Sequence, residues 1–298
     1  MRFRFARFTT VLTILALVLG NLVVATKAGD ACGTDWPKCN GNFIPSFTDY
    51  KVLIEYSHRL FTGCLGFVIL INAIVAWRKS ETGLLTVKIL SITSVMLLLL
   101  QGSIGGMNVL LGTPPGFTTF DVTVSLVLLI SIILLEVALD RKSEFDGQEK
   151  WKVTNQYGVI FKPALVVFSL YFIEVLIGAF FKHSGASKIA SNIVVHESLI
   201  ESFTFSQFIY SIHGIYNTII LITAGLILFL STRNGLLVKE SVVFFLLVIT
   251  NGLTGYITQL AYISDLSSSV HMIIVILTVA QGAYLVGRSY FGTFLATS

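Results

Sequence analysis

Long apolar runs separated by short polar connectors dominate this chain. The runs are continuously apolar, as in VVFFLLVIT, and show no regular alternation of apolar and polar positions. Because the strands of a membrane β-barrel alternate in this way, the pattern favours helices. Each run is long enough to cross a hydrocarbon core of ~30 Å at about 1.5 Å per residue. The pattern therefore predicts eight membrane-spanning helices, with approximate limits 8–26, 52–77, 84–109, 117–139, 160–181, 207–231, 237–262 and 267–288.

The longest polar connector, DRKSEFDGQEKWKVTNQYG, divides these spans into two sets of four. We therefore expect an all-α integral membrane protein built from two four-helix halves. The N-terminal half covers residues 1–145 and the C-terminal half covers residues 155–298.

Composition supports the membrane assignment. Of the 298 residues, 54% are hydrophobic and only 12% are charged, and the mean hydropathy is +0.84. Soluble domains carry about 25% charged residues, so this chain cannot cover a water-facing surface. The net charge of +4 need not indicate nucleic acid. We expect membrane lipid, and no nucleic acid, among its partners.

Lysine and arginine are unevenly divided between the two sets of connectors. The richer set contains both ends of the chain and the longest connector, and positive residues favour the cytoplasmic side. We therefore expect a multi-pass protein with both termini in the cytoplasm. A cleaved signal peptide over residues 1–28 is the alternative, disfavoured because its apolar run is too long. A prokaryotic plasma membrane is favoured over a mitochondrial inner membrane, since no Arg- and Ser-rich transit segment precedes the first span.

Two of the three cysteines lie in one outer loop, GDACGTDWPKCNGNFIPSF. Outside the cytoplasm thiols are readily oxidised, so Cys32 and Cys39 are expected to form a disulfide. Two free thiols are the second alternative, and a metal site is less favoured because the loop has no further Cys or His. Cys64, inside the second span, is expected to be a small buried residue.

Three of the five histidines lie inside predicted spans at similar depth. His58 and His213 each lie about six residues from the outer end of a span, roughly 9 Å deep, and His271 lies about four residues in. Ionisable groups in a bilayer are costly and usually functional. A shared role for these histidines is therefore predicted.

A weak internal repeat relates the same positions. EYSHRLFTG in the second span resembles YSIHGIYNT in the sixth, and QGSIGG in the third resembles NGLTGY in the seventh. When the same offset is applied to the fourth helix of each half, His271 aligns with Asp121. The repeat predicts two parallel copies of one four-helix unit, each with a site on its second and fourth helices.

Two histidines from facing helices are the usual axial ligands of a heme iron inside apolar walls. For one histidine alone, a hydrogen bond to a neighbouring helix is the better interpretation. For the pair His213 and His271 we favour heme. Zinc is less favoured, because no third or fourth ligand is apparent nearby.

The chain also resembles a known family, the heme A synthases. The resemblance is carried by ATKAGDACGTDWPKCNGNFIPSF followed by IEYSHRLFTG, by LQGSIGGMNVLLG, and by the positions of His213 and His271. It spans nearly the whole chain, in the same layout of eight helices and two halves. The motif around Cys32, Trp36 and Cys39 is the most specific part.

The resemblance implies a reaction, in which a ring methyl group of heme O is oxidised to a formyl group by successive hydroxylations. It implies a heme b cofactor held by His213 and His271, and a heme O substrate site at Glu55 and His58. Iron would thus be bound by three histidines. Glu55 lies three residues before His58 on one helix face, and would act as a proton donor or acceptor. The alternative for Glu55 is an ion pair with Arg59.

The implied partners are a heme O synthase and an electron donor, either ferredoxin-like or a quinol. The oligomeric state, a homo-oligomer included, is left open. The disulfide would shape or protect the substrate site. Lys27, Arg59 and Lys182 are candidates to face heme propionates, and His183 and His196 are expected to be solvated or to face propionates.

The chain departs from the family at Asp121, where a second histidine of the first half is expected. The carboxylate would be a weak axial ligand, a proton relay, or a mark of changed function. Two rival functions follow: a non-catalytic b-type cytochrome for electron transfer, and a heme-binding assembly or transport protein. A transporter needs a continuous polar path, and we expect no inward-facing charges across the middle of the spans.

Overall fold

The computed structural model describes residues 2–35, 38–78, 85–111, 116–145, 157–193 and 198–294. Over these ranges the regular secondary structure is helical, and loops and turns connect the helices. The helices are α1 (Arg2–Ala25), α2 (Tyr50–Arg78), α3 (Leu85–Leu111), α4 (Phe117–Phe145), α5 (Gly158–His183), α6 (Ala186–Ala190), α7 (Phe203–Asn234), α8 (Val238–Leu260) and α9 (Asp265–Phe294).

Within the described ranges, eight of these helices are long and apolar enough to cross a membrane, and α6 is short. Each of the eight long helices coincides with one of the eight predicted spans, which confirms the predicted number and positions of the membrane-spanning helices. The largest difference in where a span begins is at α1, which starts at Arg2 rather than near residue 8, and α7 starts at Phe203 rather than near residue 207. The side chain of Ser202 accepts a hydrogen bond from the backbone N–H of Phe205, and this cap moves the helix start outward. The same helix ends at Asn234, and the residue that caps it, Gly235, has a φ of +65°, which suits glycine.

Large apolar side chains cover the outer faces of the helices. Phe67 of α2 is 70% exposed, and Leu99 of α3 and Phe229 of α7 are also exposed. In water such surfaces would be costly, whereas lipid accommodates them. The protein is a multi-pass membrane protein.

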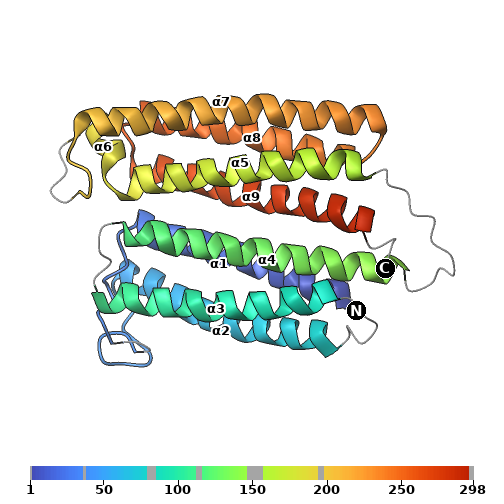
Figure 1. The fold of residues 1–298 in the computed structure, drawn as a ribbon. Helices are drawn as coiled ribbons and strands as arrows, with labels where there is room; N and C mark the ends of the chain where they lie inside the picture. Colours follow the sequence, from blue (N-terminus) through green and yellow to red (C-terminus); the bar gives the residue numbers. More distant parts are fainter. Residues whose placement is uncertain are drawn as a thin grey trace.

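The helices form two neighbouring groups (Figure 1). Helices α1 to α4 lie together, and α5, α7, α8 and α9 lie together, with α4 and α9 at the join. The main hydrophobic core runs across this join. It includes Leu129 of α4, Phe168 of α5 and Val279 of α9, all buried. The two groups therefore share a core.

One end of the bundle carries the cysteine loop and α6, and α1 begins and α9 ends at the opposite end (Figure 1). Cys32 and Cys39 are joined by a disulfide, as predicted, and both are fully buried. The expectation for Cys64 was wrong, because this residue is exposed on the outer face of α2.

Candidate functional site

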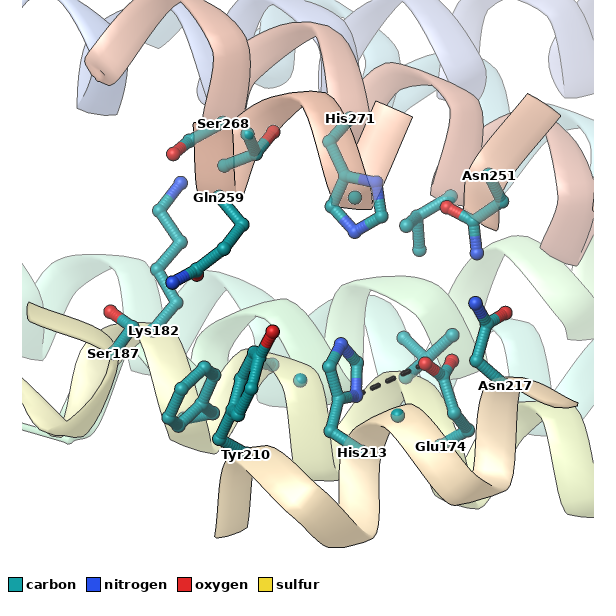
Figure 2. A pocket seen from close by; sticks show the side chains of 18 of the residues that line it. Glu174, Lys182, Ser187, Tyr210, His213, Asn217, Asn251, Gln259, Ser268 and His271 are labelled. Atoms are coloured by element: carbon teal, nitrogen blue, oxygen red, sulfur yellow. Dashed lines mark ion pairs between the residues drawn. The ribbon is translucent and has the colours of Figure 1, made fainter. Parts of the chain in front are cut away.

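The second group of helices encloses a cavity of about 340 Å³ between α5, α7, α8 and α9. His213 of α7 and His271 of α9 line it and face each other from opposite walls (Figure 2). The two histidines that the sequence placed at similar depth are thus brought to one site.

Each imidazole has a polar side chain close to its Nδ1 atom, although only that of His271 forms a hydrogen bond there among the residues described. Glu174 Oε1 of α5 lies 3.1 Å from Nδ1 of His213. Thr254 Oγ1 of α8 forms a hydrogen bond of 3.1 Å with Nδ1 of His271. The other nitrogen of each ring, Nε2, is directed into the cavity (Figure 2). Two imidazoles with a polar side chain near Nδ1 and with Nε2 directed into the cavity are arranged to bind a metal between them.

Two glycines let the neighbouring helices approach the rings closely. A Cβ atom at Gly178 of α5 would lie 2.8 Å from Cε1 of His213, and one at Gly255 of α8 would lie 3.3 Å from Cε1 of His271. A methyl group at either position would press on the ring. These close approaches restrict how the two imidazoles can turn on either side of the cavity.

The end of the cavity near α6 is polar. Lys182, His183, Ser187, Gln259 and Ser268 line it, and the Lys182 side chain reaches along the wall (Figure 2). This positive, hydrogen-bonding end suits an anionic group.

The opposite end of the cavity holds two amides, Asn217 and Asn251 (Figure 2). Asn251 donates a hydrogen bond of 3.2 Å to the buried hydroxyl of Tyr171. The Oδ1 atom of Asn251 is buried and has no hydrogen-bond partner among the residues described. The polar groups therefore gather at the two ends of the cavity and leave its middle to the histidines.

A heme fits this set of residues. The two Nε2 atoms would bind the heme iron, the glycines let α5 and α8 pack closely against both rings, and the lysine end of the cavity suits carboxylates. A heme needs only two protein ligands, because its porphyrin supplies the other four.

Glu174 and Thr254 were missed in the sequence analysis, and Glu174 corrects one of its statements. An inward-facing acid does lie well inside a span, since Glu174 is buried within YFIEVLIGAFF. The signal was present, because an ionisable residue in an apolar run is a functional candidate by itself. Thr254 lies within NGLTGY, which was noted as a repeat motif, but a threonine in a helix carries no such signal.

In the first group of helices, His58 of α2 packs against α1. A Cβ atom at Gly20 would lie 3.2 Å from its Cε1 atom, so this ring also rests on a glycine. Its Nδ1 atom is buried and has no hydrogen-bond partner in the part of the chain that the structure describes. The Nδ1 atom of His58 therefore differs from that of His271, which is hydrogen-bonded.

Glu55 lies beside the cysteine loop and is buried. Its Oε2 accepts a hydrogen bond of 2.7 Å from the backbone N–H of Cys32, and its Oε1 accepts one of 2.5 Å from Arg59. Arg59 also donates to the carbonyl oxygens of Gly33 and Lys38, at 3.0 and 3.3 Å. The ion-pair alternative for Glu55 is therefore present, with both side chains buried rather than on the surface. Together Glu55 and Arg59 clamp the disulfide loop to α2.

Asp121 of α4 is held by two amides from α3. Gln101 Nε2 donates to its Oδ1 at 2.5 Å, and Asn108 Nδ2 donates to its Oδ2 at 3.1 Å. Both carboxylate oxygens are thus engaged. This leaves Asp121 less free to bind a metal than the histidine that the repeat expects there.

The other predicted residues divide between the cavity and the surface. Lys182 and His183 line the cavity, whereas Lys27 pairs with Asp265 at 3.4 Å on the exposed surface. Arg59 is directed toward the loop carbonyls. Trp36 and His196 lie outside the described residues.

Comparison with known proteins identifies the relatives of this chain. Residues 3–282 match the model of the COX15-CtaA family, described as cytochrome oxidase assembly protein. Heme A synthase from Halalkalibacterium halodurans is 30% identical over 61% of this chain and 60% of its own length. Heme A synthase from Exiguobacterium sp. is 28% identical over 77% and 73%. That from Lysinibacillus sphaericus is 35% identical over 62% and 59%. The chain thus spans about three fifths of the length of the first and third of these relatives.

Proposed function

Because the chain belongs to the COX15-CtaA family of cytochrome oxidase assembly proteins, we propose that it is a heme A synthase-like membrane oxidoreductase. Its substrate is heme O, whose ring methyl group is oxidised to a formyl group by successive hydroxylations. Relatives named heme A synthase, at about 30% identity, support this reaction for the chain.

The facing pair of His213 and His271 carries the proposal. Both Nε2 atoms are directed into one cavity whose far end is cationic (Figure 2). We assign heme b to this cavity as the resident cofactor, which would supply one-electron redox chemistry when bound. The protein's part is to hold the two imidazoles in position and to receive the propionates near Lys182.

The substrate heme O is assigned to the first half, beside His58. The contact of Gly20 with the His58 ring parallels that of Gly178 with the His213 ring, which supports a related site in each half. Glu55 is three residues from His58 but is bound to Arg59 and to the cysteine loop. Its proposed role as proton donor or acceptor would use the second lone pair that each carboxylate oxygen retains.

Asp121 favours the rival function of a non-catalytic b-type cytochrome. Its two oxygens accept hydrogen bonds from Gln101 and Asn108, so the first half offers His58 as its one histidine ligand. The cytochrome would use only the second-half heme for electron transfer. The assembly or transport function would carry heme O without oxidising it.

The proposal also includes partners and orientation. A heme O synthase would supply the substrate, and a ferredoxin-like protein or a quinol would exchange electrons. Helix α1 begins and α9 ends at one end of the bundle, and the excess of lysine and arginine assigns that end to the cytoplasm (Figure 1). The disulfide loop is then outside.

Heme extraction from membranes that contain this protein and a heme O synthase tests the function. We expect heme A in these membranes, and its loss in His58→Ala while heme b remains. Heme b alone, with heme O left unconverted under a working electron supply, would contradict the enzyme and favour the cytochrome. An Asp121→His variant that then gains heme A would identify Asp121 as the cause.

A further inference from the structure

Glu174 is an acidic residue in the middle of a membrane-spanning helix. It lies in α5, within the apolar segment YFIEVLIGAFF, and its side chain is only 5% exposed. Burying a carboxyl group in this setting is costly unless a polar partner compensates. The position therefore needs an explanation beyond packing.

The partner of Glu174 is His213. The Oε1 atom lies 3.1 Å from Nδ1 of the imidazole, at ion-pair distance but outside hydrogen-bond geometry, and Figure 2 shows the carboxylate beside the ring. Among the residues described, no other ion pair or side-chain hydrogen bond of Glu174 is present. The carboxylate is thus committed to one nitrogen of one histidine.

The two histidines are held by unlike groups. His271 has a neutral hydroxyl, Thr254 Oγ1, at its Nδ1 atom, whereas His213 has a carboxylate. A carboxylate that accepts the Nδ1–H bond fixes the ring as the tautomer with its lone pair on Nε2, and it increases the electron donation of that nitrogen. A hydroxyl does so less strongly. The two axial positions are therefore inequivalent.

We propose that Glu174 is a positioning residue: its carboxylate, 3.1 Å from Nδ1 of His213, accepts the Nδ1–H when the ring binds the heme iron, orients Nε2 and lowers the midpoint potential of the heme. This inference rests on the proposed function, because it assumes that the cavity binds heme. Second-sphere hydrogen bonds to axial ligands are one of the means by which a protein sets a heme potential. A lower potential makes the bound heme a stronger electron donor.

Redox titration of the purified protein with its bound heme tests this role. The variants are Glu174→Gln, which keeps the size of the side chain, and Glu174→Leu, which removes the acceptor. Thr254→Val is the matched control on the opposite histidine. We expect heme to be retained and the ferrous-to-ferric ratio at a fixed potential to rise at least tenfold in Glu174→Gln, equivalent to about 59 mV for a one-electron couple. Glu174→Leu should raise the midpoint potential further, and Thr254→Val should change it less than either Glu174 variant does.

The electron paramagnetic resonance spectrum of the ferric protein supplies a second readout. We expect the low-spin g values to change in Glu174→Gln, since the orientation and basicity of His213 change. If Glu174→Leu fails to fold, Glu174→Gln still decides the question. A folded Glu174→Gln protein that loses heme would support the positioning role, provided that Thr254→Val keeps it.

The outcomes separate this role from the function on which it rests. A potential and g values unchanged in both Glu174 variants, with a spectrum that depends on His213, would overturn the role of Glu174 alone. A wild-type protein without heme, or with a heme spectrum unchanged in His213→Ala, would overturn the heme site and this role together.

Discussion

Single side chains determine how the histidines of this protein lie. Gly178 and Gly255 allow helices α5 and α8 to touch the imidazoles, and Gly20 does the same for His58. These glycines are needed for close approach rather than for a turn. The orientation of each ring is thus set partly by the absence of a side chain on the neighbouring helix.

Gly178→Ala should displace His213. The new methyl group would lie 2.8 Å from Cε1, closer than carbon atoms approach without a shift, so the ring must move. We expect a lower heme content per protein and a loss of stability of about 1–3 kcal/mol, typical of overpacking. Both are measured by absorbance and thermal unfolding in detergent. Gly225→Ala on α7 is the control, since its methyl group would meet Phe245 at an ordinary 3.6 Å. Equal heme content in the two variants would contradict this explanation.

Glu55→Ala should destabilise the protein through Arg59. The change removes the anion from a guanidinium whose side chain is only 10% exposed, and breaking a buried pair in this way costs about 3–5 kcal/mol. Lys27→Ala is the control, because its pair with Asp265 is exposed and should contribute less than about 1 kcal/mol. Thermal unfolding of the two variants checks the difference. Similar small losses in both would mean that Glu55 does not stabilise the loop.

At the scale of elements, the disulfide loop and α2 form one unit. Cys32 and Cys39 are seven positions apart, and the loop that they close is tied to α2 by Glu55 and Arg59. The same helix carries His58. The loop therefore determines which polar groups lie above the proposed substrate site.

Replacing both cysteines with serine should lower the stability of the first half. A disulfide that closes so short a loop contributes about 2 kcal/mol by restricting the unfolded chain. We expect an earlier unfolding transition and faster proteolysis at the loop, with the heme b spectrum unchanged because that site lies in the second half. A changed heme b spectrum would show that the loop reaches the second site.

At the scale of the whole molecule, the two halves are joined by more than the chain. The amide of Asn21 on α1 donates to the backbone oxygen and the hydroxyl of Ser269 on α9, at 3.0 and 2.6 Å, and the main core spans both groups of helices. Ser269 is two residues from His271, and Asn21 follows the glycine that touches His58. The two proposed sites are thus connected through a buried contact.

Residues 1–145 and 155–298, expressed together as separate chains, should associate and purify as one complex. The shared core leaves apolar and polar surfaces exposed on each half alone, so neither half should be stable by itself. Size-exclusion chromatography and the heme spectrum measure this. A stable, heme-containing second half without the first would show that the halves fold independently.

Much of this arrangement could be predicted from the sequence, because lipid imposes long apolar spans whose limits are visible as composition. The disulfide was predicted because its loop was expected on the oxidising side of the membrane. The pairing of His213 with His271 was predicted because the two residues lie at similar depth in their spans. The partners of Glu55, Glu174 and Asp121 did not follow, since they depend on contacts between helices that are distant in the chain. Periodicity identifies the face of a helix but not the side chain opposite it.

The division of labour between the halves is the central claim, and the reduced-minus-oxidised spectrum of the purified protein tests it most directly. The comparison needs the wild type, His213→Ala, His271→Ala and His58→Ala. We predict a low-spin heme b spectrum in the wild type, its loss in each second-half variant, and its full retention in His58→Ala. A spectrum lost in His58→Ala but retained in His213→Ala or His271→Ala would contradict the account.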